Sequence, residues 1–117
     1  MVEGKATAIE RFGLGPRTLD LLREVFRRHC EVKRVKIFGS RAIGRFEDYS
    51  DVDLALWGDL NLGLIGRIAA ELDELPLPYT FDVKAYEVIK NAPLKRHIDE
   101  FGKILYDGQS HGKDPRT

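Results

Sequence analysis

Two aspartates, Asp51 and Asp53, stand at the start of an apolar run that continues to Trp57. Side chains two apart on a strand point to the same side, so these carboxylates would lie about 7 Å apart on one face. Aspartate is disfavoured in strands and the two charges repel, so a bound cation is the simplest compensation. Carboxylate oxygens suit Mg²⁺ or Mn²⁺. The alternative is a pair of aspartates on a solvent-facing edge strand.

A third carboxylate, Asp82, lies in a later strand-like run over residues 79–86, on the side opposite its apolar residues. If the strands pair with their apolar faces together, Asp82 joins Asp51 and Asp53 on one side of the sheet. Three carboxylates there predict a two-metal site for phosphoryl or nucleotidyl transfer. One ion would bind the phosphates and the other would lower the pKa of the attacking hydroxyl. The alternative for Asp82 is an ordinary edge position.

Gly39 and Ser40 follow an apolar strand-like run and precede a segment that can open a helix. Free backbone N–H groups at such a turn, together with the Ser40 hydroxyl, can hold phosphate oxygens. Glycine allows a close approach because it has no Cβ. Arg41 is placed to add positive charge to a triphosphate, or else to form a surface salt bridge. Taken alone, a Gly-Ser pair is most often a simple turn.

Hydrophobic periodicity and turn residues predict the elements that must position these groups. Asn61 and Asn91 are candidate helix caps, and Gly102 is expected to end a helix in the left-handed conformation. His97 lies near the apolar stripe of the last helix and is expected to pack rather than to catalyse. We expect helices at 16–29, 41–46, 62–74 and 92–101, strands at 33–38, 51–57 and 79–86, and a possible closing strand at 103–106.

This order of elements predicts an α/β (α+β) fold in which helices pack on a small mixed sheet. The 117 residues are expected to form a single domain over 1–109, with a disordered tail at 110–117. Lys and Arg number 19, as do Asp and Glu, so no direct nucleic-acid binding is expected. Cys30 is the single cysteine, and no apolar stretch approaches the roughly 20 residues of a membrane span. A cytoplasmic protein with a protein partner is expected.

Gly39-Ser40, ten further residues and then Asp51-Val52-Asp53 resemble the Gly-Ser-x10-Asp-x-Asp signature of the DNA polymerase β-like nucleotidyltransferase superfamily. The string from Phe38 to Ala55 is similar to that of its small single-domain branch, the minimal nucleotidyltransferases (MNT). The resemblance also includes residues 76–82, as the strand of the third carboxylate, and residues 91–106, as the C-terminal helix and closing segment.

The resemblance implies the polymerase β-like palm fold, with Asp51, Asp53 and Asp82 as catalytic metal ligands. It implies Gly39 and Ser40 as the phosphate-binding turn. Arg41, which follows them, is a candidate nucleotide-binding residue. By the same resemblance, two Mg²⁺ or Mn²⁺ ions are expected, and ATP is the donor. The acceptor attacks the α-phosphate and pyrophosphate leaves.

Minimal nucleotidyltransferases are typically paired with a helical HEPN-domain protein in toxin–antitoxin systems. By resemblance, this chain is expected to be the antitoxin and to transfer AMP to a tyrosine of its HEPN toxin. Two alternatives stay open. In the first, the chain is an adenylyltransferase for a small hydroxyl compound, as antibiotic nucleotidyltransferases are. In the second, it is a nucleotide-binding antitoxin that neutralises its partner by contact without catalysis.

Overall fold

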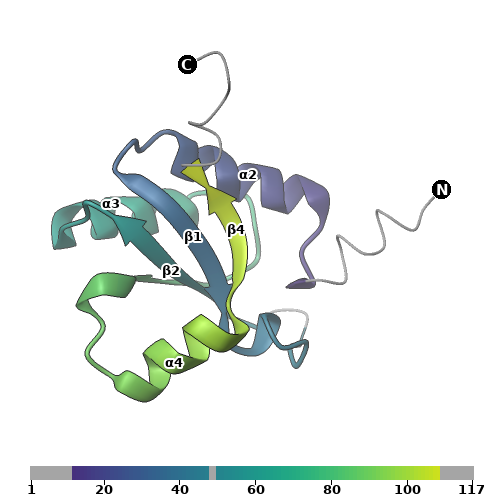
Figure 1. The fold of residues 1–117 in the computed structure, drawn as a ribbon. Coiled ribbons are helices and arrows are strands. Elements are labelled where there is room, and N and C mark those ends of the chain that lie inside the picture. Colours follow the sequence, from purple (N-terminus) through teal and green to yellow (C-terminus); the bar gives the residue numbers. More distant parts are fainter. Residues whose placement is uncertain (1–11, 48–49, 109–117) are drawn as a thin grey trace, which may run out of the picture.

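The computed structural model describes residues 12–47 and 50–108 and contains one four-stranded mixed sheet (Figure 1). The strand order is β3-β2-β1-β4. The inner strand β1 is antiparallel to both of its neighbours, β2 and β4, whereas β2 and β3 are parallel. The predicted mixed α/β class is confirmed. The strands are β1 (Val32–Phe38), β2 (Val52–Gly58), β3 (Phe81–Ala85) and β4 (Lys103–Asp107).

Helices cover both faces of the sheet. The helices α2 (Pro16–Arg27) and α3 (Leu62–Asp73) pack on one face, and α4 (Ala92–Phe101) lies on the other (Figure 1). The larger core joins the inward sides of α2 and α3 to alternate residues of the strands. A smaller core forms where Ile98 of α4 meets Phe38 and Ala55. Alternation along β2 therefore leaves Asp53 on the α4 side of the sheet.

Asparagine caps begin two of the helices, as the sequence predicts. The side chain of Asn61 accepts a hydrogen bond from the Leu64 N–H at 2.8 Å, and Asn91 accepts one from Leu94 at 2.9 Å. Each bond satisfies one of the N–H groups that a helix start leaves without an intrahelical partner. These caps fix where α3 and α4 begin.

Gly102 differs from its prediction, because its φ of −62° and ψ of 144° are extended rather than left-handed. The chain passes straight from α4 into β4, which confirms the closing strand. The predicted helix at 41–46 is also wrong: the structure has a single 3₁₀ turn, η1 (Gly39–Arg41), because the chain then turns into a loop before β2. The predicted tail at 110–117 lies outside the described residues.

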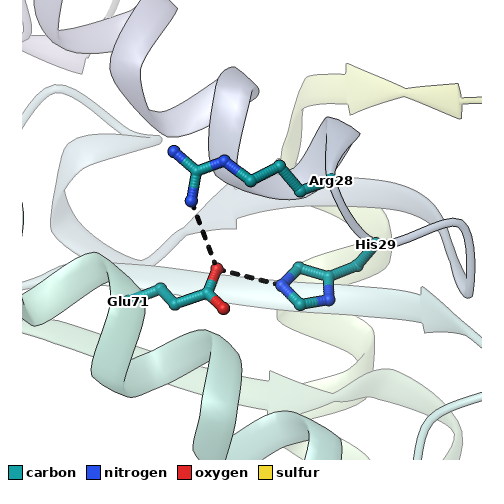
Figure 2. Close-up of polar contacts among 3 residues, drawn as sticks. All are labelled: Arg28, His29 and Glu71. Carbon is teal, nitrogen blue, oxygen red and sulfur yellow. Dashed lines mark hydrogen bonds and ion pairs between the residues drawn. The ribbon is translucent and has the colours of Figure 1, made fainter.

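A small polar cluster links the end of α2 to α3 (Figure 2). Nε2 of His29 lies 3.0 Å from Oε1 of Glu71, and a guanidinium nitrogen of Arg28 lies 3.6 Å from the same oxygen. Cys30 is exposed and lies beyond α2, which ends at Arg27. The cluster closes the end of the helical layer with partly exposed side chains.

A second 3₁₀ turn, η2 (Tyr86–Val88), leads from β3 toward α4. Within the ranges that the structure describes, no helix is long and apolar enough to cross a membrane. The elements that matter for chemistry are therefore the turn after β1, the start of β2 and the start of β3.

Candidate active site

The parallel register of β2 and β3 places Asp53 directly opposite Asp82. On its other side, Asp53 lies opposite Phe38, the last residue of β1. Asp51 is exposed and lies just before β2. The pairing of β2 with β3 brings Asp53 and Asp82 together from strands that lie far apart in sequence. They lie beside the end of β1, where Gly39 begins the turn.

Burial and charge make the carboxylate of Asp53 reluctant to ionise. Its pKa is raised above the ordinary value of 3.8, first by burial, then by the nearby charges of Asp82 and Asp51. Lys84 and His97 lower it by a smaller amount. Lys84 also forms an ion pair with Asp82 at 3.4 Å. The site therefore carries more negative charge than its cationic neighbours offset.

The carboxylates fit a hard divalent cation by their chemistry, since Mg²⁺ binds oxygen ligands. In the parts of the chain that the structure describes, however, no group of three or more His, Cys, Asp or Glu side chains is arranged to hold a metal ion. Mg²⁺ usually binds through one or two carboxylates, with waters and substrate phosphates completing its shell. The pair of Asp53 and Asp82 matches that smaller protein contribution.

Gly39 brings the backbone of the Gly-Ser turn against Asp53. Its φ of 76° lies in the left-handed region, which a residue with a Cβ adopts at a cost. A Cβ at this position would also collide with Oδ2 of Asp53. Both the backbone conformation and the lack of space therefore require glycine at position 39. The predicted phosphate turn and the predicted carboxylate of Asp53 meet at this contact. Ser40 follows in the same turn and is half-buried.

Arg41 occupies a different position from the one that its predicted role requires. Its side chain is fully buried. Nη1 donates to the carbonyl of Phe12 at 2.7 Å, and Nη2 donates to the carbonyl of Ser50 at 3.0 Å. The guanidinium also lies 5.0 Å from the Phe46 ring centre and 4.9 Å from that of Tyr79. The expectation that Arg41 adds its charge to a triphosphate therefore does not fit this structure.

The buried arginine instead organises the chain before the carboxylates. Its bonds to Ser50 fix the end of the loop one residue before Asp51. The side chain of Ser50 in turn accepts a hydrogen bond from the Glu47 N–H at 2.7 Å. Sequence reasoning missed this role because an arginine beside a Gly-Ser turn suggests an exposed charge, and no local pattern shows that it is buried.

His97 is a second residue whose place the sequence did not predict in full. Its ring packs as expected, 6.2 Å from the Phe38 ring and 5.4 Å from the Phe101 ring. Nε2 also accepts a hydrogen bond from the Gly39 N–H at 3.0 Å. The packing prediction is confirmed, but the contact with the turn depends on how α4 crosses the sheet. Sequence periodicity carries no signal for that crossing.

A shallow cavity of about 480 Å³ lies away from this group, lined by Glu31, Asp59, Asn61, Gly63, Leu64 and Arg67. It borders the end of β2 at which Val32 pairs with Gly58, opposite the end that carries Asp53. The carboxylates themselves stand at an open edge, since the side chain of Asp82 is 47% exposed. The candidate site is thus an open surface at this edge of the sheet rather than an enclosed chamber.

Solved structures share this fold. A crystal structure of a toxin–antitoxin complex with AMP-PNP aligns with a TM-score of 0.66 and 19% identity, covering 81% of this chain and 77% of that chain. A chain from the structure of the tri-AMPylated Shewanella oneidensis HEPN toxin in complex with MNT antitoxin aligns with a TM-score of 0.61 and 17% identity, covering 83% of this chain and 76% of that chain. A putative nucleotidyltransferase from Sulfolobus solfataricus aligns with a TM-score of 0.52 and 19% identity, covering 93% of this chain and 94% of that chain.

Sequence comparison gives the family. No curated protein sequence matches this chain significantly. The family model for "Polymerase beta, Nucleotidyltransferase" matches residues 21–111, which is most of the chain and contains the Gly-Ser turn and all three aspartates. The resemblance of the sequence signature is therefore confirmed at the level of the family. The chain belongs to the polymerase beta nucleotidyltransferase family.

Proposed function

We propose that this protein is a metal-dependent nucleotidyltransferase that moves AMP from ATP to a tyrosine hydroxyl of a HEPN toxin, and so acts as an antitoxin. The observation that carries the proposal is the meeting of Asp53, Asp82 and Gly39 at one edge of the sheet. That arrangement places carboxylates for a cation beside a turn suited to phosphate. Membership of the nucleotidyltransferase family supports the same reaction class.

In this proposal, Gly39 and Ser40 bind the phosphates of ATP through backbone N–H groups and the Ser40 hydroxyl. Asp53 and Asp82 would hold Mg²⁺, which would neutralise charge on the phosphates and lower the pKa of the attacking hydroxyl. Asp51, which lies just before β2 and is not grouped with them as a metal-binding set in the described residues, is proposed as a further ligand. Burial and then repulsion from Asp82 and Asp51 raise the pKa of Asp53, so the site gains from such a cation. The proposal includes a cytoplasmic location, where ATP is available as the donor.

The reaction needs positioning more than covalent chemistry from the protein. The acceptor oxygen attacks the α-phosphorus of ATP in line with the bond to the bridging oxygen of the β-phosphate. A new oxygen–phosphorus bond forms, the bridging bond breaks, and pyrophosphate leaves with the electron pair. Asp82 is proposed to help deprotonate the acceptor hydroxyl through the metal that it would bind, and the proton passes to solvent.

The exposure of the site supports a macromolecular acceptor. Asp51 is exposed and nearly half of the Asp82 side chain is accessible, so a side chain of another protein has a direct approach. The cavity lined by Glu31 and Arg67 lies at the other end of β2 and is not placed to present a small acceptor to the carboxylates. Similar folds occur in antitoxins that are bound to HEPN toxin.

Incubation with ATP labelled in the α-phosphate tests the proposal. The protein is purified together with its genomic neighbour, a HEPN-domain protein if the proposal holds. We expect Mg²⁺-dependent label on that partner, and loss of the label when a tyrosine of the partner is replaced by phenylalanine. Label on a small hydroxyl compound instead would favour a small-molecule adenylyltransferase. Full protection from the toxin by the double variant Asp51→Asn/Asp53→Asn would contradict the enzymatic account and favour neutralisation by contact.

A further inference from the structure

The amide of Gly39 already has a partner within this chain. Its N–H donates to Nε2 of His97 across 3.0 Å, from a residue 58 positions away in sequence. A ring nitrogen that accepts a hydrogen bond carries no proton, so in this contact the hydrogen of the neutral ring is on Nδ1. The group that the proposed function assigns to a phosphate oxygen is thus occupied by a side chain of α4.

The ring of His97 is held in place for this contact. It packs edge-on against Phe38, with an interplanar angle of 73°, and at 39° against Phe101. The next residue, Ile98, is fully buried in the core between α4 and the sheet. The side chain therefore loses little additional conformational freedom when it accepts the Gly39 N–H.

The contact lies where the two halves of the candidate site meet. Gly39 abuts Oδ2 of Asp53, and its N–H lies against Nε2 of His97. A phosphate oxygen that binds the Gly39 N–H must enter the position that Nε2 now fills, because one N–H makes one strong hydrogen bond. The oxygen of a phosphate is charged and accepts a stronger hydrogen bond than a neutral ring nitrogen.

We propose that His97 guards the Gly39 amide: it satisfies the N–H in the absence of nucleotide and is displaced when a phosphate oxygen of a nucleoside triphosphate binds. This inference rests on the proposed function for the identity of the ligand. The guard keeps the turn formed without nucleotide, since an N–H left without a partner carries a desolvation cost. It also weakens nucleotide binding, because each binding event must break the bond to His97.

Binding of the ATP analogue AMP-PNP with Mg²⁺, measured by isothermal titration calorimetry, tests this role. His97→Leu replaces the ring with an apolar side chain of similar size and removes the Nε2 acceptor. We expect this variant to bind AMP-PNP about 3- to 10-fold more tightly than the wild type. His97→Gln restores an acceptor near the position of Nε2 and should return the affinity toward that of the wild type. His29→Leu is the matched control, because His29 contacts Glu71 on the other face of the sheet.

The proposed role of His97 would be overturned if His97→Leu bound AMP-PNP no more tightly than the wild type and than His97→Gln. Thermal melting shows whether each variant folds. If His97→Leu does not fold, NMR of the wild type decides the question. Loss of the hydrogen bond between Gly39 and His97 on addition of AMP-PNP supports displacement, and its persistence in the bound state refutes it.

The two proposals fail in different ways. Nucleotide binding needs no acceptor, so a partner that stays unlabelled in the transfer assay would contradict the proposed function and leave the ranking of the His97 variants intact. Conversely, normal transfer together with unchanged binding by His97→Leu would remove the guard alone. If neither the wild type nor His97→Leu binds AMP-PNP, both proposals are wrong.

Discussion

Asp53 is half-buried near two other carboxylates, and its pKa is raised by burial first and by Asp82 and Asp51 after it. A folded-state pKa above the unfolded value means that the folded protein binds a proton more readily. Ionised Asp53 therefore opposes folding at neutral pH. As the pH falls through the raised pKa toward 3.8, this unfavourable contribution disappears.

Asp53→Asn should consequently raise the melting temperature of the ligand-free protein by a few degrees at neutral pH. The gain should shrink as the pH is lowered toward 4, where the wild-type carboxyl is also neutral. Thermal denaturation followed by circular dichroism across this pH range is the measurement. A variant less stable than the wild type at neutral pH would show that Asp53 is stabilised by partners rather than strained by like charges.

Arg41 gives a second prediction for a single residue, because its guanidinium binds the carbonyls of Phe12 and Ser50 in the interior. Arg41→Lys keeps the charge but lacks the planar fork that reaches both carbonyls. We expect it to lower the free energy of unfolding by about 2 kcal/mol while leaving the KM for ATP unchanged well below the melting temperature. Urea denaturation and steady-state kinetics are the measurements. An unchanged stability with a raised KM would restore the predicted contact with the triphosphate.

Among the elements, the turn between β1 and β2 has the tightest demands. Gly39 and Gly44 both have positive φ, at 76° and 78°. A Cβ at Gly39 meets Oδ2 of Asp53, whereas a Cβ at Gly44 meets no atom within 4 Å. The two glycines therefore separate the cost of the backbone conformation from the cost of the collision.

Gly44→Ala should lose about 1 kcal/mol of stability from backbone conformation and keep its nucleotide affinity. Gly39→Ala should lose more, because Asp53 must also move, and its affinity for Mg²⁺ and AMP-PNP should fall at least about 10-fold. Denaturation and calorimetry of the two variants make the comparison. Equal behaviour of the two variants would mean that the close contact with Asp53 does not matter for binding.

The sequence predicted those parts of the fold that depend on local pattern. Alternation along two strands was enough to expect Asp53 and Asp82 on one face, and their register bears this out. The asparagine caps were predictable for the same reason, since a cap is a contact over three residues. The burial of Arg41 was not, because its partner Phe12 lies 29 positions away and no periodic pattern links the two.

The contact between His97 and Gly39 shows the same limit at the level of element packing. A helical stripe tells which side of α4 faces the sheet, and the packing of His97 on Phe38 follows from it. The position of Nε2 above the turn depends on the crossing of α4 over β1, which is set by the chain after β3 and by the entry into β4. Those are tertiary constraints, so the candidate guard emerged from the structure alone.

For the molecule as a whole, the sheet brings residues from three distant segments to one open edge. The turn after β1, the start of β2 and the start of β3 each supply one part of the site. Helices cover both faces of the sheet, and the carboxylates stay accessible at its edge. This accessibility supports the proposed acceptor, a side chain of a second protein.

The most direct test of the account follows the phosphates of ATP in parallel reactions with the co-purified partner, one labelled in the α-phosphate and one in the γ-phosphate. Nucleotidyl transfer predicts α-label on the partner, γ-label in released pyrophosphate, and loss of both with Asp51→Asn/Asp53→Asn. Label from the γ-phosphate on the partner would mean phosphoryl transfer. Label from neither position, with the toxin still neutralised, would contradict the central claim that this edge of the sheet transfers AMP.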